Sequence, residues 1–346
     1  MISLFNQINC AFQNFGEILC KKLDLDILKS ACFKGKAVFG PVKSRRLGYS
    51  LGINTMKCKM CTYDCVYCQN GSTSCRSTCR DSCIGEYELF CVVRKKLELL
   101  QAQNIPVDYI TFVSSGEPTL DDNLASKIKL LREFGHKIAV ITNGSLFWND
   151  KVQEDLLLAD YVSVKIDTLN EETWQIINRP HSRLRFQNIL DGIERFSKSY
   201  KGILTTETML VKNLNDSLQE VEAIGSFLKE IKRNKSYFAF PTRPPVESFV
   251  LPPDQQTLSQ ISDFITNNIP NSEMLFAPEE DVFYGAGELE DELLATLSAQ
   301  PMREETVKKF ITNKGGGIHT LQQMLNSNNI SEVMFEGNRF YSSNNA

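Results

Sequence analysis

Three cysteines in the stretch CTYDCVYC have types and spacing that could do chemistry. Cys61, Cys65 and Cys68 follow a C-x3-C-x2-C pattern. Thiolates are soft, polarisable donors, which makes them good ligands for iron–sulfur clusters. Three ligands from one loop leave one iron of a four-iron cluster without a protein ligand, so an exogenous molecule can bind there. The spacing therefore predicts a 4Fe-4S cluster with one exchangeable position.

Two alternatives treat the same loop as a metal-binding module that performs no reaction. Cys58 precedes Cys61 by three residues, so the four cysteines could form a four-thiolate zinc site. Zinc loops usually pair two C-x2-C knuckles across an intervening stretch, which disfavours this reading. All four cysteines could also hold a saturated cluster that only carries electrons.

The remaining cysteines form two further sets, and all eleven cysteines lie at or before Cys91. Three are near the N-terminus, at uneven spacing: Cys10, Cys20 and Cys32. Three more occur in CRSTCRDSC: Cys75, Cys79 and Cys83. If that stretch were helical, its cysteines would line one face. Either set could hold a second metal centre or have no metal function.

Charge and hydropathy limit the partners and the cellular location expected for the protein. The 346 residues carry a net charge of −4, but residues 34–100 contain 12 Lys and Arg against 5 Asp and Glu. Such a stretch can attract anionic substrates or RNA, or it can be a solvated face. No apolar run reaches the roughly 18 residues of a membrane span, and the first residues lack the pattern of a signal peptide. With this number of cysteines, we expect a reducing, cytoplasmic location and no membrane partner.

Short apolar runs alternate with helical patterns over residues 49–241. Alternation of this kind predicts a parallel sheet covered by helices, and six such units predict a partial (β/α)6 barrel. The expected strands are residues 49–55, 109–115, 137–142, 161–167, 203–211 and 236–241. The clearest helical segments between them are residues 86–101, 123–134 and 217–232.

The strand YVSVKID indicates which side faces the barrel interior. Its apolar residues share one side, and Ser163, Lys165 and Asp167 share the other. In a barrel the apolar side packs against the helices, so the three polar residues should face inward. Buried polar groups cost free energy unless they are hydrogen-bonded or in use, so a site is expected there. Lys165 could form a Schiff base with a substrate, or pair with Asp167 or Glu207.

The chain divides into four expected parts. After residue 241 a proline-rich connection and an acidic stretch follow, and the last part contains two helices (303–312 and 318–326) and a hairpin turning at residues 336–338. Two helices and a hairpin are typical of a winged-helix module. The expected parts are an N-terminal helical segment (1–37), the barrel (38–245), a linker and acidic helical segment (246–301) and a winged-helix-like module (302–346).

The cysteine loop and the motifs that follow it resemble the radical S-adenosylmethionine (radical SAM) superfamily. SSGEPTL contains Gly116, Glu117 and Pro118, and is similar to the glycine-rich motif that receives the methionine amino group. The resemblance implies an enzyme that cleaves S-adenosylmethionine reductively at a 4Fe-4S cluster and forms a 5′-deoxyadenosyl radical.

The same resemblance implies further contacts with S-adenosylmethionine. Tyr67 is the aromatic residue before the last cysteine, and Asn143 lies in the TNG turn that relatives place near the nucleoside. Ser163 and Asp167 match positions that contact ribose or the methionine carboxylate. An electron donor such as ferredoxin or flavodoxin is implied as a partner.

Residues 38–245 resemble one branch in particular, which is grouped with the tRNA wyosine-base synthases. The segments that carry this likeness include FGPVKSRRLGYSLGIN (39–54), TNGSL, NRPH and PTRPP. In the wyosine synthases a lysine engages pyruvate, and Lys165 is the candidate for a catalytic lysine here. The likeness implies an RNA substrate, with tRNA the first to consider.

Overall fold

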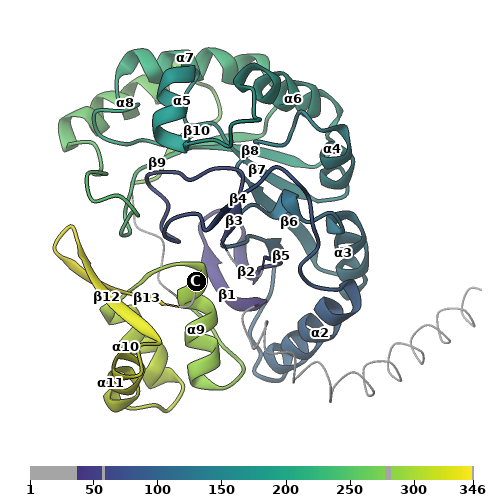
Figure 1. The fold of residues 1–346 in the computed structure, drawn as a ribbon, viewed down its shortest axis with the longest axis vertical. Coiled ribbons are helices and arrows are strands. Elements are labelled where there is room, and N and C mark those ends of the chain that lie inside the picture. Colours follow the sequence, from purple (N-terminus) through teal and green to yellow (C-terminus); the bar gives the residue numbers. More distant parts are fainter. Residues whose placement is uncertain (1–36, 57–58, 277–281, 345–346) are drawn as a thin grey trace, which may run out of the picture.

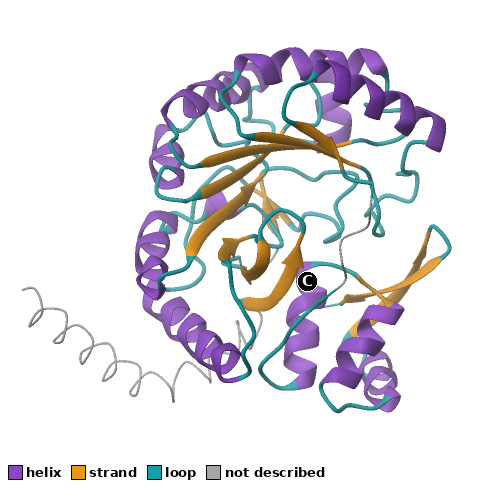
Figure 2. Ribbon diagram, turned by 180° about the vertical axis from the view of Figure 1, so that it is seen from behind, coloured by secondary structure: helices purple, strands orange, loops and turns teal. Residues whose placement is uncertain are grey.

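The computed structural model describes residues 37–56, 59–276 and 282–344. Its main body is one eight-stranded sheet in the order β1-β2-β5-β6-β7-β8-β9-β10, covered on its outer side by helices (Figures 1 and 2). Among the described residues β1 and β10 do not pair, so the sheet curves into an open, partial barrel. The chain alternates strand and helix through this body, as the sequence predicts.

The strands of the barrel are parallel except for the first. β1 pairs antiparallel with β2, and the other neighbours from β2 to β10 pair in parallel. The strands are β1 (Val38–Ser44), β2 (Gly48–Ile53), β5 (Tyr109–Phe112), β6 (Lys137–Thr142), β7 (Tyr161–Lys165), β8 (Ile203–Met209), β9 (Lys235–Ala239) and β10 (Ser272–Met274). The six expected strands are thus confirmed, and β1 and β10 extend the sheet at its two edges.

The covering helices follow from amphipathic sequence and local caps. In α6 the residues that face the sheet recur at helical spacing, so one side of the helix packs into the core. Asn170 caps α5 through Thr173 N at 3.0 Å, and Ser217 caps α7 through Glu220 N at 3.2 Å. The helices of the barrel are α2 (Glu86–Ala102), η2 (Pro118–Leu120), α3 (Leu124–Leu131), η3 (Arg132–Phe134), α4 (Asp150–Leu156), α5 (Glu171–Asn178), α6 (Phe186–Ser199), α7 (Leu218–Glu230) and α8 (Gln255–Asn268).

The barrel sheet extends past the expected boundary at residue 245. β10 pairs in parallel with β9, and α8 packs against both β10 and α7. The stretch expected as a linker therefore supplies a further strand and helix of the barrel. The reason is that α8 has buried residues at helical spacing, Leu258, Ile261 and Ile265, which need an apolar partner surface.

The C-terminal module has its own core and a three-stranded sheet in the order β11-β13-β12. The expected hairpin is present, and its turn is shorter than residues 336–338: Phe335 pairs with Asn338, and Glu336 and Gly337 between them have positive φ. α9 joins this core, so the module begins before residue 302. Its elements are α9 (Leu289–Ala299), β11 (Met302–Arg303), α10 (Glu304–Asn313), α11 (Ile318–Asn326), β12 (Ile330–Phe335) and β13 (Asn338–Ser343).

The module attaches to the edge of the barrel at β1. α9 packs against β1, and Lys43 N donates to Val282 O at 3.1 Å. Lys96 of α2 forms a buried ion pair with Glu292 of α9. Figure 1 shows α9 beside β1, with the β12–β13 hairpin extending away from it.

Candidate active site

The cysteine loop lies on one side of the barrel, and two short paired strands hold it. β3 (Met60–Cys61) pairs with β4 (Cys75–Arg76), and the loop that contains them lies in front of the sheet in Figure 1. Asp64 N donates to Asn178 O at 3.0 Å, and Val66 N donates to Ile177 O at 2.9 Å. These bonds tie the loop to the C-terminal end of α5, which follows β7.

Each of the three cysteine sulfurs has its own nitrogen donor. The donors are Asn143 Nδ2 to Cys61 Sγ at 3.4 Å, Asn178 Nδ2 to Cys65 Sγ at 3.4 Å, and Lys59 Nζ to Cys68 Sγ at 3.0 Å. Hydrogen bonds to sulfur stabilise negative charge on it and tune the potential of a cluster that it ligates. The surroundings of the loop therefore fit thiolate ligands.

Burial affects how these thiols ionise. Burial, with the nearby Glu117 carboxylate, raises the pKa of Cys61 to about 12. Burial, with Cys61 and Asp167 close by, also raises the pKa of Cys65 well above its ordinary value. A metal centre that binds here must displace protons from thiols that would otherwise keep them.

The zinc alternative requires four thiolates around one ion. Among the described residues, no three or more His, Cys, Asp and Glu side chains are grouped so that they could hold one metal ion. Zinc draws its thiolates around one centre at about 2.3 Å, whereas a four-iron cluster places each thiolate on a separate iron. Cys58, the fourth ligand of the zinc alternative, lies outside the described residues.

Gly116 allows the GEP segment to lie against the start of the cysteine loop. A Cβ at Gly116 would lie 1.8 Å from Met60 O, so any other residue would force the two segments apart. Glu117 N donates to Met60 O at 3.0 Å. The glycine is therefore required for contact between the end of β5 and β3.

The Glu117 carboxylate is already engaged by the protein. Its Oε1 accepts from Thr119 N, Thr119 Oγ1 and Thr142 Oγ1, and its Oε2 accepts from Asn143 N at 2.7 Å. Burial raises the pKa of Glu117, and these donors act in the opposite direction. Glu117 thus joins the ends of β5 and β6, and only Oε2 retains capacity for a further donor. The sequence suggested an open acceptor at this position.

The TNG turn orients Asn143 toward the cysteine loop. Gly144 has φ +77°, and a Cβ there would lie 2.5 Å from Val164 Cγ2. Asn143 Oδ1 accepts from Ser145 N at 2.9 Å, while its Nδ2 donates to Thr62 Oγ1 at 2.8 Å as well as to Cys61. Both ends of this amide are therefore fixed.

Asp167 lies two residues beyond the end of β7 and contacts residues from three other segments. It accepts hydrogen bonds from Tyr67 OH, from Asn178 Nδ2 at 2.8 Å and from Met209 N at 2.9 Å. Ser163 is buried on the same side of β7, four residues before Asp167. Two of the expected contact residues, Tyr67 and Asp167, therefore touch each other directly, and Asn178 links them to Cys65.

Lys165 faces the barrel interior, where it pairs with Glu207 of β8 at 2.6 Å. Arg46, from the loop between β1 and β2, pairs with the same carboxylate. Burial lowers the pKa of Lys165, but Glu207 and Asp167 outweigh it and raise the pKa above its ordinary value. Lys165 is thus a cation bound in an ion pair with Glu207, as the ion-pair interpretation of the sequence expected.

Sequence comparison identifies the family. Residues 57–227 match the model of the radical SAM superfamily. A UPF0026 protein of Methanocaldococcus jannaschii is 38% identical over 308 residues, which cover 88% of this chain and 95% of that protein. A UPF0026 protein of Helicobacter pylori is 30% identical over 308 residues, which cover 88% of this chain and 96% of that protein.

The chain belongs to the UPF0026 family of radical SAM proteins. A radical SAM methyltransferase from Sphaerobacter thermophilus has the same type of fold, with a TM-score of 0.54 at 14% identity over 65% of each chain. By its match to the radical SAM model, the protein is an iron–sulfur enzyme that uses a 4Fe-4S cluster and S-adenosylmethionine. When bound, the cluster supplies an electron that breaks the S–C5′ bond and yields methionine and the 5′-deoxyadenosyl radical.

Several residues of the site were not expected from the sequence. Asn178 and Lys59 contact the cysteine sulfurs, and Arg46 reaches Glu207 across the barrel. One local signal could have indicated Asn178: it is the last residue of a helix, followed by Arg179 with φ +43° and by a proline. A polar residue just before such a turn, near the end of a barrel strand, is a candidate for the site.

The second cysteine set adopts a different structure. Residues 77–83 are not helical, and Cys75 lies in the short strand β4, so the cysteines do not line a helix face. Cys75 and Cys79 are exposed. Arg80 holds the segment in place instead, donating to Thr119 O and Asp121 O. Cys10, Cys20 and Cys32 lie outside the described residues.

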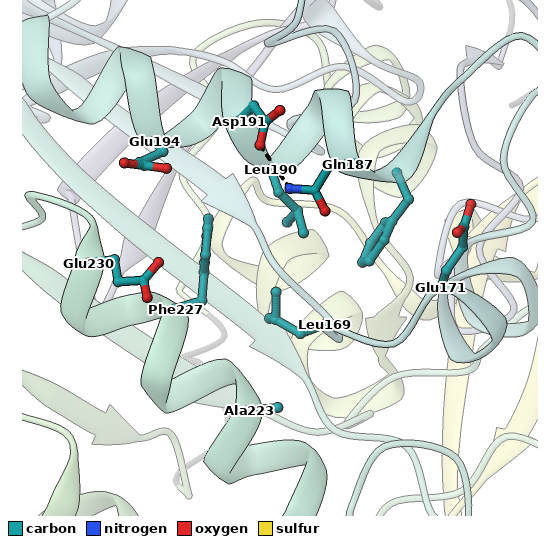
Figure 3. Close-up of a pocket in the computed structure, with 10 residues that line it drawn as sticks. Leu169, Glu171, Gln187, Leu190, Asp191, Glu194, Ala223, Phe227 and Glu230 are labelled. Atoms are coloured by element: carbon teal, nitrogen blue, oxygen red, sulfur yellow. Dashed lines mark hydrogen bonds between the residues drawn. The ribbon is translucent and has the colours of Figure 1, made fainter.

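A separate groove lies on the outer surface between α6 and α7 (Figure 3). Phe227 and Leu169 line its floor, and Gln187 donates to Asp191 at 2.8 Å on one side. Carboxylates from Glu171, Asp191, Glu194 and Glu230 surround it. None of its lining residues belongs to the cysteine loop, and its acidic rim is unsuited to anionic ligands.

Proposed function

We propose that Cys61, Cys65 and Cys68 are the protein ligands of the cluster, and that S-adenosylmethionine binds beside them at the ends of β5, β6 and β7. The single observation that carries this proposal is that each of the three sulfurs accepts from its own nitrogen donor, an arrangement that suits thiolate ligands. The loop leaves one position for a ligand that is not a side chain of the protein.

The residues around the loop have distinct roles in this proposal. Gly116 and Pro118 form the close backbone approach beside which the methionine part of the ligand binds, and Glu117 Oε2 accepts from its ammonium group. Asn143 contacts the nucleoside side while it donates to Cys61. Tyr67 keeps Asp167 aimed at the site through its hydroxyl hydrogen bond.

Ser163 and Lys165 line the interior beneath this binding site. Ser163 is buried on β7 and offers a hydroxyl to the ribose or the carboxylate. The ammonium group of Lys165 lies 5.1 Å from the centroid of the Tyr67 ring, so it is adjacent to the cysteine loop. We assign Lys165 a catalytic role as the cation that contacts an anionic part of the substrate.

The reaction on S-adenosylmethionine tests this proposal. The protein is reconstituted without oxygen with iron and sulfide, reduced with dithionite and supplied with S-adenosylmethionine, and 5′-deoxyadenosine is measured. The wild type and Cys79→Ser should form it, and Cys65→Ser should not. A Cys65→Ser protein with full cleavage would contradict the ligand assignment.

The substrate that we propose is RNA, with tRNA the first candidate. The support is the likeness of residues 38–245 to the branch grouped with the wyosine-base synthases. The basic stretch at residues 34–100 gives no further support for an RNA substrate, because several of its charged side chains are buried or paired within the fold. Lys59 is buried, Lys96 pairs with Glu292, and Arg80 pairs with Asp155. Comparing the modified nucleosides of cells with and without the protein tests this substrate, and an unchanged nucleoside profile would exclude it.

We propose that the enzyme works in the cytoplasm with a low-potential electron carrier. Buried thiols that hold a cluster need a reducing compartment. Within the described part of the chain, no helix is both long and apolar enough to cross a bilayer. Cell fractionation with an antibody to the protein measures the location.

A further inference from the structure

The outer side of the cysteine loop carries a compact group of arginines and apolar side chains. We call this group the loop face, and it consists of Arg76, Arg179, Arg183, Arg185, Ile176 and Phe249. It comes from three segments that are distant in the sequence: β4, the end of α5 with its following loop, and the proline-rich stretch after β9.

Main-chain hydrogen bonds hold all three segments against the cysteine loop. Ser77 N donates to Cys61 O at 3.0 Å, directly after Arg76. His181 N donates to Thr62 O at 2.9 Å, between Arg179 and Arg183. Glu247 N donates to Val66 O at 3.2 Å, two residues before Phe249. All three segments of the loop face are therefore bonded directly to the cysteine loop.

The arginines give this surface a positive charge. Arg76, Arg183 and Arg185 are exposed, and no carboxylate in the described part of the chain pairs with them. The guanidinium groups of Arg76 and Arg185 donate to main-chain oxygens, for example Arg76 Nη1 to Arg179 O at 3.2 Å and Arg185 Nη1 to Ser182 O at 3.0 Å. Two carboxylates lie nearby. Glu247 pairs with Arg179, and Asp64 accepts from Thr73 N.

Two apolar side chains are exposed within the same surface. Ile176 is 53% exposed and Phe249 is 54% exposed. Each adjoins a residue that packs or bonds against Val66: Ile177 accepts from Val66 N, and Val250 is buried in one cluster with Val66. Exposed apolar residues beside arginines are typical of a protein–protein interface.

We propose that the loop face docks an acidic one-electron carrier protein that reduces the cluster. This inference rests on the proposed function, because it needs a cluster at the cysteine loop. One electron leaves the reduced carrier, which is oxidised, and enters the cluster, which is reduced; no bond forms or breaks in this step. Opposite charges steer such short-lived encounters, and the apolar residues favour close contact once the partners meet.

The surface fits a protein better than a polynucleotide. Ile176 is aliphatic and cannot stack on a base as an aromatic ring does. The face is also small, with four arginines, one of which is neutralised by Glu247. A position beside the cysteine loop shortens the path for an electron, whereas it offers no advantage for holding the part of an RNA that must react inside the barrel.

The test uses the full-length, cluster-loaded enzyme and a flavodoxin of strongly negative net charge. The charge-reversal variant is Arg183→Glu with Arg185→Glu. The matched control is Lys129→Glu with Lys201→Glu, two exposed lysines outside the loop face that form no ion pair with the described part of the chain. Binding is measured by calorimetry at low and high ionic strength. Electron transfer is measured from the flavin absorbance after rapid mixing with reduced flavodoxin.

The reversal should raise the Kd for flavodoxin and lower the electron-transfer rate about tenfold or more at low ionic strength, and the difference should shrink at high ionic strength. The control should match the wild type. As a second variant, Ile176→Ser should weaken binding at both ionic strengths. Iron content and thermal unfolding show whether each variant is folded and loaded.

Two results would overturn the docking proposal: unchanged flavodoxin binding and electron transfer in the arginine variant, or loss of tRNA binding in that variant while electron transfer from flavodoxin stays normal. Cleavage of S-adenosylmethionine with dithionite separates this failure from failure of the proposed function. All of these variants should cleave normally with dithionite, and a wild type that does not cleave would refute the function itself.

Discussion

Two sets of three cysteines lie within 23 residues of each other, and their surroundings differ sharply. Cys61 and Cys65 are deep enough for burial to raise their pKa values, and the sulfurs of the first set accept from Asn143, Asn178 and Lys59. The second set, Cys75, Cys79 and Cys83, lies in a segment whose first two cysteines are exposed, and no hydrogen bond to their sulfurs is found among the described residues.

The difference teaches that spacing alone does not define a metal site. Both sets place three thiols within nine residues, so composition makes them look alike. What separates them is the surrounding set of donors, two of which come from the ends of β6 and α5 and the third from Lys59, directly before Met60. Outer partners of this kind orient ligands and tune their charge.

The largest effect is expected from removing the cysteines themselves. Replacing Cys61, Cys65 and Cys68 with serine should abolish cluster assembly, because serine is a poor ligand for iron in a cluster of this type. The same replacement of Cys75, Cys79 and Cys83 should leave iron and acid-labile sulfide at wild-type content. Iron and acid-labile sulfide are measured in both variants after anaerobic reconstitution. Loss of iron in the second variant would contradict the difference between the two cysteine sets.

The stability of the segment that contains Cys75, Cys79 and Cys83 should depend on Arg80 and not on these cysteines. Arg80 donates to two main-chain oxygens and pairs with Asp155, whose side chain is 1% exposed. Arg80→Ala leaves that carboxylate buried without its arginine, so the free energy of unfolding should fall by about 3–5 kcal/mol. Cys79→Ser should change it by less than about 0.5 kcal/mol. Urea unfolding of both variants gives the comparison, and equal stabilities would contradict it.

The ion pairs inside the barrel should contribute stability that is lost at acidic pH. Burial would raise the pKa of Glu207, but Arg46 and Lys165 outweigh it and lower the pKa well below its ordinary value. Because the pKa is lowered by folding, this stability is present above the unfolded value of about 4.3 and is lost as the pH falls below it.

Glu207→Gln should therefore destabilise the protein by about 2–3 kcal/mol at neutral pH and flatten the loss of stability below about pH 4.3. The measurement is urea unfolding between neutral and acidic pH. If the variant and the wild type lost stability in parallel below that pH, Glu207 would not be the group responsible.

The smallest effect is expected from one sulfur donor. Asn178→Ala removes the hydrogen bond to Cys65 and should lower the reduction potential of the cluster by about 40 mV, which corresponds to one neutral hydrogen bond of about 1 kcal/mol. Asn149→Ala, which removes a cap from α4, is the control and should leave the potential unchanged. A redox titration followed by electron paramagnetic resonance measures the shift, and equal potentials would show that the donor shell is unimportant.

The sequence by itself determined the elements whose pattern is local. The six parallel strands were predicted from apolar runs, and the inward side of β7 from its alternation, because strand periodicity depends only on neighbouring residues. The hairpin turn at Glu336 and Gly337 was likewise predicted from turn chemistry. The cysteine loop was recognisable because its three thiols lie within eight residues.

Only the tertiary structure decided which side chains meet. Arg46 and Glu207 are 161 residues apart, and Asn178 and Cys65 are 113 apart, so no local period relates them. The same holds for the Glu117 carboxylate, which turns toward Thr142 and Asn143. β10 joined the barrel for a similar reason, since its three residues form a strand only because β9 is beside them. Such contacts depend on how the strands are stacked in the sheet, and that arrangement is fixed by burial of the whole core and not by any single segment.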